Sequence, residues 1–256
     1  MPIGLSPTGE AMLRALMGAA EQVGDRVSKT RVYRGDSDWL VLFGVGAAPR
    51  DMARNAQVGK GKRAILWDLG YFGREKVVGH LRVSVDTDHP QEWLDKGSAD
   101  PRRWQAHGIM LREDANPRGH VVLVGLGTKS RAYLGLPNWE RDKLAELRVR
   151  FPHNQIVYRP KPKHESPVLD CNEDTHASIE DSLRGAALVV CRHSNVAVDA
   201  AIAGVPFEAE NGAAMWLARR PFTLQNRLEF LWRLAWWQWR AVEAPQAWAF
   251  LRKVLA

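Results

Sequence analysis

The chain has 256 residues, of which 45% are hydrophobic and 25% are charged, and its formal net charge at pH 7 is +7. This length allows one large domain or two small ones, and the composition excludes a disordered chain. No apolar run approaches the roughly 20 residues needed to span a bilayer. The positive charge favours a polyanionic partner, either nucleic acid or nucleotide phosphates, although a basic enzyme without such a partner is the alternative.

Two features of the sequence predict a cytoplasmic protein. The N-terminus lacks the basic, apolar and small-residue segments of a secretory signal, and residues 8–23 are instead typical of an amphipathic helix. The two cysteines, Cys171 and Cys191, are too few for a disulfide framework. We therefore expect a reducing compartment and no membrane association.

The first half of the sequence alternates expected strands with helical and loop segments. The strands are expected at Trp39–Phe43, Ala64–Trp67 and His80–Val85, with a helical stretch near Arg50–Gln57. Such alternation predicts an α/β domain with a mostly parallel sheet. The polar stretch from Gly97 to Gly119, broken by glycine and proline, marks its end, so this domain is expected to span residues 1–115.

The second half begins a new α/β domain, expected over residues 116–222. Its first elements are expected to be a strand at His120–Val124, a helix at Asn138–Arg150 and a strand at Gln155–Tyr158. Pro137 and Asn138 are typical of the first positions of a helix, which supports the expected start of the helix near Asn138.

The last segment, residues 223–256, is expected to be a helical tail that packs back on the first domain. Two helices are expected, at Leu224–Val242 and Gln246–Leu255. Trp232, Trp236 and Trp239 have the spacing of one helical face, which leaves Trp237 off it. Core packing explains this face better than stacking on nucleic-acid bases.

Residues 185–211 are expected to form one βαβ unit, around which the second domain is organised. Its elements are a strand at Ala186–Cys191, a helix at Val196–Ala203 ended by Gly204, and a strand at Val205–Glu208. The polar corner Arg192–Asn195 follows the first strand, at the carboxyl end where doubly wound sheets bind ligands. The helix that begins there has free backbone N–H groups, which favour a phosphate. Simple N-capping by Ser194 or Asn195 is the alternative.

Two other strand ends in this domain carry groups that suit phosphate. The segment Gly125–Ser130 offers glycines, hydroxyls and a lysine, but it has neither the P-loop spacing nor GxGxxG, so a plain turn is equally possible. After the next strand, prolines hold Arg159, Lys161 and Lys163 in an extended segment, with a solvated basic loop as the alternative. We expect the three segments to converge on one edge of a sheet.

Residues 120–218 resemble the donor-binding half of a GT-B glycosyltransferase, especially the capsule-type Kdo and sialyl transferases. Arg159-Pro160-Lys161-Pro162 is similar to the basic-proline motif of these families. His193-Ser194-Asn195, followed by Gly204-Val205-Pro206, is similar to their hydroxyl pair at a helix start. The sequence departs from the pattern with a lysine where a histidine often flanks the proline, and with Asn195 in place of a second serine or threonine.

The resemblance implies two small Rossmann-like domains in a GT-B-like fold with a C-terminal helical tail. It also implies a nucleotide-sugar donor, with a UDP-sugar as the first expectation, and no metal, because helix termini and cations stabilise the leaving diphosphate. Glu208 follows the last strand, where such folds often place an acid that binds sugar or ribose, although a surface acid is equally possible. The expected donor-binding residues are Gly125, Gly127, Thr128, Lys129, Arg159, Lys161, Ser194, Asn195 and Glu208.

Two residues are candidates for acid–base chemistry. Asp68 follows the strand Ala64–Trp67 and is the first candidate for the base that activates an acceptor hydroxyl, with a capping aspartate as the alternative. His193 is a candidate for a catalytic acid or a phosphate ligand, and a structural histidine fits its position equally well. Asp86-Thr87-Asp88 is similar to a metal-binding DxD motif, but Asp36-Ser37-Asp38 repeats this short pattern, so we interpret it as a turn.

These observations predict a glycosyltransferase with the donor on the second domain and the acceptor on the first. The basic charge, the small size and a Trp-rich ending that resembles those of phage proteins favour DNA as the acceptor. The specific prediction is a hydroxymethylated pyrimidine in phage DNA, flipped out of the duplex in the host cytoplasm. The alternatives are a capsule- or lipopolysaccharide-type sugar transferase, and a catalytically silent nucleic-acid-binding protein of the same fold.

Overall fold

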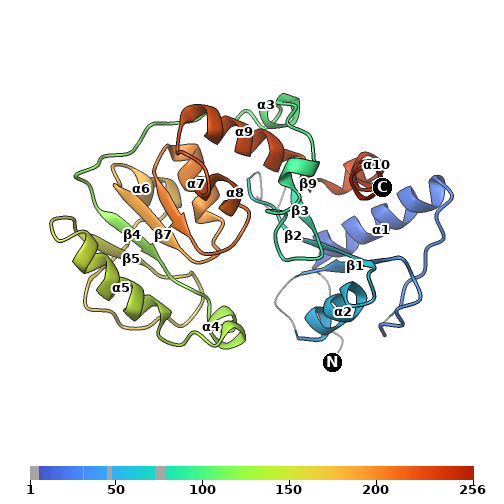
Figure 1. The fold of residues 1–256 in the computed structure, drawn as a ribbon, viewed down its shortest axis with the longest axis horizontal. Coiled ribbons are helices and arrows are strands. Elements are labelled where there is room, and N and C mark those ends of the chain that lie inside the picture. The colour runs from blue at the N-terminus through green and yellow to red at the C-terminus, as the bar shows by residue number, and fades with distance from the viewer. Residues whose placement is uncertain (1–5, 31, 45–47, 73–78) are drawn as a thin grey trace. The chain divides into compact units, whose positions relative to one another are not determined.

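The computed structural model describes residues 6–30, 32–44, 48–72 and 79–256 (Figure 1). The chain divides into two compact units. Unit 1 comprises Met1–His107 and Leu231–Ala256, and unit 2 comprises Gly108–Phe230. Each unit is built on its own sheet, and unit 1 contains both ends of the chain.

Unit 1 has a four-stranded sheet in the order β1-β2-β3-β9. Its strands are β1 (Trp39–Phe43), β2 (Arg63–Leu69), β3 (Leu81–Val85) and β9 (Gln238–Trp239). Strands β1 and β2 are parallel, whereas β2–β3 and β3–β9 are antiparallel. The expectation of a mostly parallel sheet is therefore wrong for this unit. A parallel crossover needs about a dozen residues or more, usually with a helix, and the segment between Leu69 and Leu81 is too short for one.

Helices flank the sheet of unit 1, with α1 and α10 on one side and α2 on the other (Figure 1). The helical elements are α1 (Pro7–Gln22), α2 (Ala48–Val58), η1 (Leu94–Lys96), α3 (Arg102–Gln105), η2 (Ala241–Glu243) and α10 (Ala244–Leu255). Helix α1 begins after Ser6, whose hydroxyl accepts a hydrogen bond from the N–H of Gly9 at 3.2 Å. Its buried side chains Met12 and Leu16 have helical spacing, and α1 packs against α10.

The end of the chain differs from the long helix expected at Leu224–Val242. Helix α9 (Leu224–Ala235) stops early, and β9 then joins the edge of the unit 1 sheet. Trp237, expected to lie off the buried face, is fully buried, and Trp239 is 1% exposed. The predicted tryptophan face is therefore wrong, although both indoles belong to the core. Pairing with β3 satisfies the backbone of β9 while burying large aromatic surfaces, and this outweighs the helical periodicity.

Unit 2 has a five-stranded sheet in the order β6-β5-β4-β7-β8, and all of its strand pairs are parallel. Its strands are β4 (Val121–Val124), β5 (Ile156–Arg159), β6 (Asn172–Glu173), β7 (Leu188–Cys191) and β8 (Phe207–Ala209). Every residue of β4 and β7 is buried, as expected for central strands covered on both faces.

Helices cover both faces of this sheet (Figure 1). They are α4 (Thr128–Leu134), α5 (Trp139–Arg150), α6 (Ile179–Leu183), α7 (Val196–Ala203) and α8 (Met215–Ala218), with α9 following. On one face, Leu144 and Leu147 of α5 pack in a core cluster with Leu123 and Val190. Helices α6 and α7 lie on the other face, and Gly204 ends α7 in the left-handed conformation with φ +76°. The βαβ unit expected at residues 185–211 is present as β7, α7 and β8.

Candidate functional site

The carboxyl ends of β4, β5 and β7 lie side by side in unit 2. Val124 pairs with Arg159, and Leu123 pairs with Val190, so the three strands end at the same edge of the sheet. We name the segments that leave this edge the strand-end loops: residues 125–130, 160–166 and 192–195. Side chains and helix starts in these loops can reach one ligand, as is usual at the carboxyl edge of a parallel sheet.

The two glycines of the first strand-end loop lie close to side chains of β5 and of the second loop. A Cβ atom on Gly125 would overlap the Tyr158 hydroxyl, whose strand lies alongside. A Cβ atom on Gly127 would lie 3.2 Å from Lys161 Cδ and 3.2 Å from His164 Cε1. Gly127 also precedes the first residue of α4, Thr128. Close contact with Tyr158 therefore favours glycine at position 125, whereas a side chain at position 127 would displace Lys161 and His164; neither glycine has a positive φ angle.

His164 belongs to this edge, although the sequence did not single it out. Its N–H donates to the carbonyl of Lys161 at 3.2 Å, which closes a turn with Pro162 at the second position. Lys163, at the third position, has φ +64°, the left-handed region that a type II turn requires and that usually selects glycine. A strained residue of this kind is a mark of functional sites. The expectation of an extended segment is therefore wrong beyond Lys161, because Pro162 suits the second position of a turn, and only the contact with Gly127 reveals where His164 lies.

The third strand-end loop joins the first through His193. The imidazole Nε2 of His193 lies 3.5 Å from the hydroxyl of Ser130, in the first turn of α4. The Ser194 hydroxyl accepts a hydrogen bond from the N–H of Val196 at 3.2 Å, and Asn195 is the N-cap residue of α7. The predicted residues Gly125, Gly127, Thr128, Lys161, His193, Ser194 and Asn195 thus lie in three adjoining loops. Thr128, Lys129 and Lys161 are exposed.

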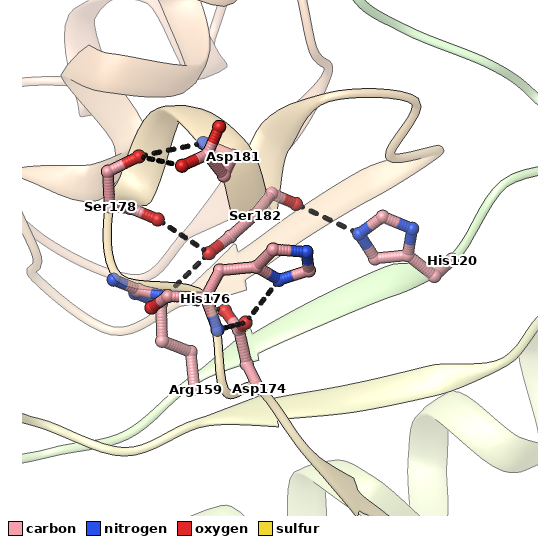
Figure 2. Close-up of polar contacts among 7 residues, drawn as sticks. All are labelled: His120, Arg159, Asp174, His176, Ser178, Asp181 and Ser182. Atoms are coloured by element: carbon pink, nitrogen blue, oxygen red, sulfur yellow. Dashed lines mark hydrogen bonds and ion pairs between the residues drawn. The ribbon is translucent and has the colours of Figure 1, made fainter.

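Arg159 is held by a polar network on the α6 side of the sheet (Figure 2). Its Nη1 donates to Asp174 Oδ2 at 2.7 Å, to the Ser182 hydroxyl at 2.5 Å and to the His176 carbonyl at 3.3 Å. Burial alone raises the pKa of Asp174, but hydrogen bonds from Ser182, Arg159 and His176 outweigh burial and lower this pKa to about 2. Asp174 therefore remains a carboxylate that orients Arg159 at the exit of β5.

The two acids after the last strand have different surroundings. Glu208 accepts hydrogen bonds from Arg150, the last residue of α5. Glu210 accepts from Trp139 Nε1 at 2.9 Å, at the first residue of the same helix. Glu210 Oε2 also lies 3.5 Å from Arg192 Nε, directly before His193. Of the two acids, Glu210 is thus the one linked to the strand-end loops, whereas Glu208 is engaged on the face of the sheet that α5 covers.

Asp68 lies in unit 1, at the end of a chain of polar contacts. Its Oδ2 is 3.2 Å from Arg82 Nη2. Nη1 of Arg82 and the hydroxyl of Tyr71 lie 3.2 Å and 3.1 Å from Nδ1 of His89. Because arginine can only donate, this imidazole nitrogen is an acceptor. Burial raises the pKa of Tyr71 to about 12, so Tyr71 stays protonated. Arg82, which contacts the same His89 nitrogen as Tyr71, also holds the Asp68 carboxylate.

The Asp86-Thr87-Asp88 segment forms a turn. Asp86 has φ +64°, and its carboxylate accepts hydrogen bonds from the N–H of Ala64 at 2.9 Å and from Arg63 Nη1 at 2.7 Å. The carboxylate of Asp88 contacts Arg54. Both acids are thus engaged by arginines. Within residues 6–30, 32–44, 48–72 and 79–256, no group of three or more His, Cys, Asp or Glu side chains has a metal-binding arrangement.

Comparison with known proteins gives a likeness in fold only. No protein-family model matches the sequence, and no curated protein sequence matches it. Among the helices of the described residues, none is long and apolar enough to cross a membrane. A solved structure of Thermosulfurimonas dismutans KpsC, beta Kdo 2,4 transferase, is similar over 94% of this chain and 95% of that chain, with a TM-score of 0.52 and 11% identity.

A second solved structure, Thermosulfurimonas dismutans KpsC, beta Kdo 2,7 transferase, is similar over 84% of this chain and 85% of that chain, with a TM-score of 0.46 and 15% identity. The TM-score of this second structure is too low for it to support the fold assignment. The expected fold class, an α/β protein with two Rossmann-like units in a GT-B-like fold and a helix at the C-terminus, is confirmed, with the mixed sheet of unit 1 as its main departure.

Proposed function

We propose that this chain is a glycosyltransferase that binds a nucleotide-sugar donor at the strand-end loops of unit 2 and transfers the sugar to a saccharide. The observation that carries the proposal is the meeting of the three loops at one edge of a parallel sheet, with Gly127 packed against the basic loop. A GT-B-like fold is the second support. The neighbour of similar fold is described as a Kdo transferase, which favours a saccharide over DNA as the acceptor.

Each loop has a part in holding the donor in this proposal. Thr128 and Lys129, which are exposed directly after Gly127, offer a hydroxyl and a positive charge to the phosphates. Lys161 adds positive charge, and Arg159 adds its charge from the Asp174 network. The start of α7, with Ser194 and Asn195, offers further N–H and hydroxyl donors. Glu208 remains the proposed contact to sugar or ribose, together with Glu210, which lies beside Arg192.

Transfer requires an acceptor hydroxyl to lose its proton as its oxygen bonds to the anomeric carbon of the donor. The bond from that carbon to the phosphate oxygen breaks, and the nucleoside phosphate leaves. We propose Asp68 as the base that takes the proton and His193 as a group that hydrogen-bonds or protonates the leaving phosphate. Lysines and helix starts stabilise the charge that develops there, so the proposed reaction requires no metal.

The hydroxymethylated pyrimidine expected as acceptor rests on the net charge of +7 and on the Trp-rich ending. The comparisons give DNA no support, and the tryptophans Trp237 and Trp239 are buried in the core. The charge is also accounted for by an anionic donor. The saccharide-directed alternative is therefore the better reading, and the catalytically silent protein is the outcome that an absence of donor binding would indicate.

A transfer assay with two classes of acceptor tests the proposal. The protein is incubated with UDP-, GDP- and CMP-sugars and either an oligosaccharide mixture or DNA that contains 5-hydroxymethylcytosine, and the products are weighed by mass spectrometry. We expect a sugar-sized gain on the saccharide alone. A gain on the modified base would restore DNA as the acceptor. An absence of both transfer and donor binding would exclude a glycosyltransferase.

A further inference from the structure

A buried carboxylate lies beneath the first strand-end loop. Glu140, the second residue of α5, is 0% exposed. Its Oε1 accepts a hydrogen bond from the backbone N–H of Leu126 at 2.9 Å, between the two close-packed glycines. Its Oε2 is buried and has no hydrogen-bond partner among the residues that the structure describes. Burial of a carboxylate is costly unless it is paired, so the presence of Glu140 here requires an explanation.

Arg131 completes the contacts of the same backbone. Its Nη2 donates to the carbonyl of Leu126 at 3.1 Å, and its Nε lies 3.8 Å from Glu140 Oε1. The N–H and the carbonyl of Leu126 are thus held by an acid and a base that also attract each other. With its side chain 15% exposed, Arg131 is shielded enough for this pairing to outlast screening by salt.

Arg131 also reaches the second strand-end loop. The same Nη2 donates to the carbonyl of Glu165, which follows His164 directly. The carbonyl of Gly127 in turn accepts the N–H of Arg131 at 3.0 Å. One guanidinium therefore ties the glycine loop to the end of the basic loop, at the place where Lys161 and His164 contact Gly127.

We infer that Glu140 and Arg131 are a positioning pair for the donor site: they hold the glycine loop and the basic loop at the spacing that accepts the donor phosphates. This inference rests on the proposed function. Neither side chain needs to touch the donor. If both side chains act by holding the same backbone segment, their effects on donor affinity are not additive. Once one partner has been removed, removal of the other should weaken binding little further.

A double-mutant cycle tests the pair. Dissociation constants for the nucleotide sugar, or for its nucleoside phosphate, are measured by titration calorimetry for the wild type, Glu140→Gln, Arg131→Gln and the double variant. We expect each single variant to bind about tenfold more weakly, and the double variant to lose little more than either single one. The matched controls, Arg141→Gln and Asp142→Asn, change the same charges at exposed positions of α5 and should bind as the wild type does.

A second variant and a second measurement separate positioning from folding. Arg131→Lys keeps the charge but cannot hold Leu126 and Glu165 together, so it should weaken binding while the melting temperature without ligand stays unchanged. Amide hydrogen exchange at Leu126 should become faster in Glu140→Gln. The inference alone would be overturned if the variants bound the nucleotide sugar as tightly as the wild type. It would also be overturned if the effects of the two single substitutions simply added in the double variant. A wild type that binds no nucleotide sugar would overturn the proposed function, and the inference with it.

Discussion

The two sheets differ in the edges at which their loops leave the strands, and this decides which polar residues can lie close together. In unit 2 all strands are parallel, so the loops after β4, β5 and β7 meet at one edge. In unit 1, β2 and β3 are antiparallel, so Asp68, near the end of β2, and Asp86, directly after β3, lie at opposite ends of the pair. Register shows the same separation, because Asp68 is opposite Arg82, whereas Asp86 binds the N–H of Ala64.

The two units also differ in the surroundings of the charged side chains at their strand ends. The acids at the strand ends of unit 1 contact arginines: Asp68 with Arg82, Asp86 with Arg63 and Asp88 with Arg54. At the strand-end loops of unit 2, the exposed Lys129 and Lys161 and a helix start lie near Gly125 and Gly127, which are buried. This difference fits our proposal that unit 2 binds the donor, whereas arginines hold these acids of unit 1 in place.

The largest effect is expected from a tryptophan in the core of unit 1. Trp237→Ala should lower the free energy of unfolding by about 3–5 kcal/mol, because it removes a fully buried indole and leaves a cavity. Urea unfolding followed by circular dichroism measures the loss. Trp232→Ala, at a partly exposed position in α9, is the control and should cost less. Equal losses would mean that Trp232 is as deeply buried as Trp237, contrary to the structure.

Asp68→Asn tests whether unit 1 contributes chemistry rather than binding. It should lower the rate of transfer about a hundredfold or more, the range for a lost general base, while the dissociation constant of the donor stays unchanged. Steady-state kinetics and calorimetry give the two quantities. Asp36→Asn changes the same charge at an exposed position and should have no effect. Full turnover in the Asp68 variant would remove this residue from the mechanism.

Asp174 tests the buried ion pair of unit 2 through pH. Its folded-state pKa of about 2 lies below the ordinary value of about 3.9, so the unfolded chain binds more protons between these values. Stability from this group is present above pH ~4 and is lost as the pH falls toward ~2, by about 2 kcal/mol in all. Asp174→Asn should flatten the acid limb of a stability–pH curve, which Asp142→Asn should leave unchanged.

The smallest effect is expected at the contact between two strand-end loops. In Gly127→Ala the new methyl would press on Lys161 and His164 at 3.2 Å, so these side chains must shift. Donor affinity should fall by about tenfold, equivalent to ~1.4 kcal/mol, with little change in stability. Gly18→Ala, whose methyl would meet nothing within 4 Å in α1, is the control and should stabilise that helix by about 0.5–1 kcal/mol. An unchanged affinity in Gly127→Ala would mean that the loop contact has no part in binding.

Much of unit 2 follows from short-range sequence signals. Apolar runs such as Val121–Val124 predict buried strands, and Gly204 predicts the end of α7. The position of the phosphate-friendly segments at strand ends follows from the same signals. These features were predictable because each depends on residues within one element and its ends.

Three features depended on contacts between distant parts of the chain. Residues Gln238–Trp239 pair with β3, although their spacing suits a helix, and this pairing makes the sheet of unit 1 mixed. His164 enters the site through a contact with Gly127, and Glu140 through the N–H of Leu126. The sequence by itself determined the central strands β4, β5 and β7 of unit 2 and the helices α5 and α7, because local sterics and periodicity decide those. Only the tertiary structure decided strand direction, the engagement of Asp68 by Arg82 and the pairing of Glu140 with Arg131, because burial and charge pairing act between residues that the sequence keeps apart.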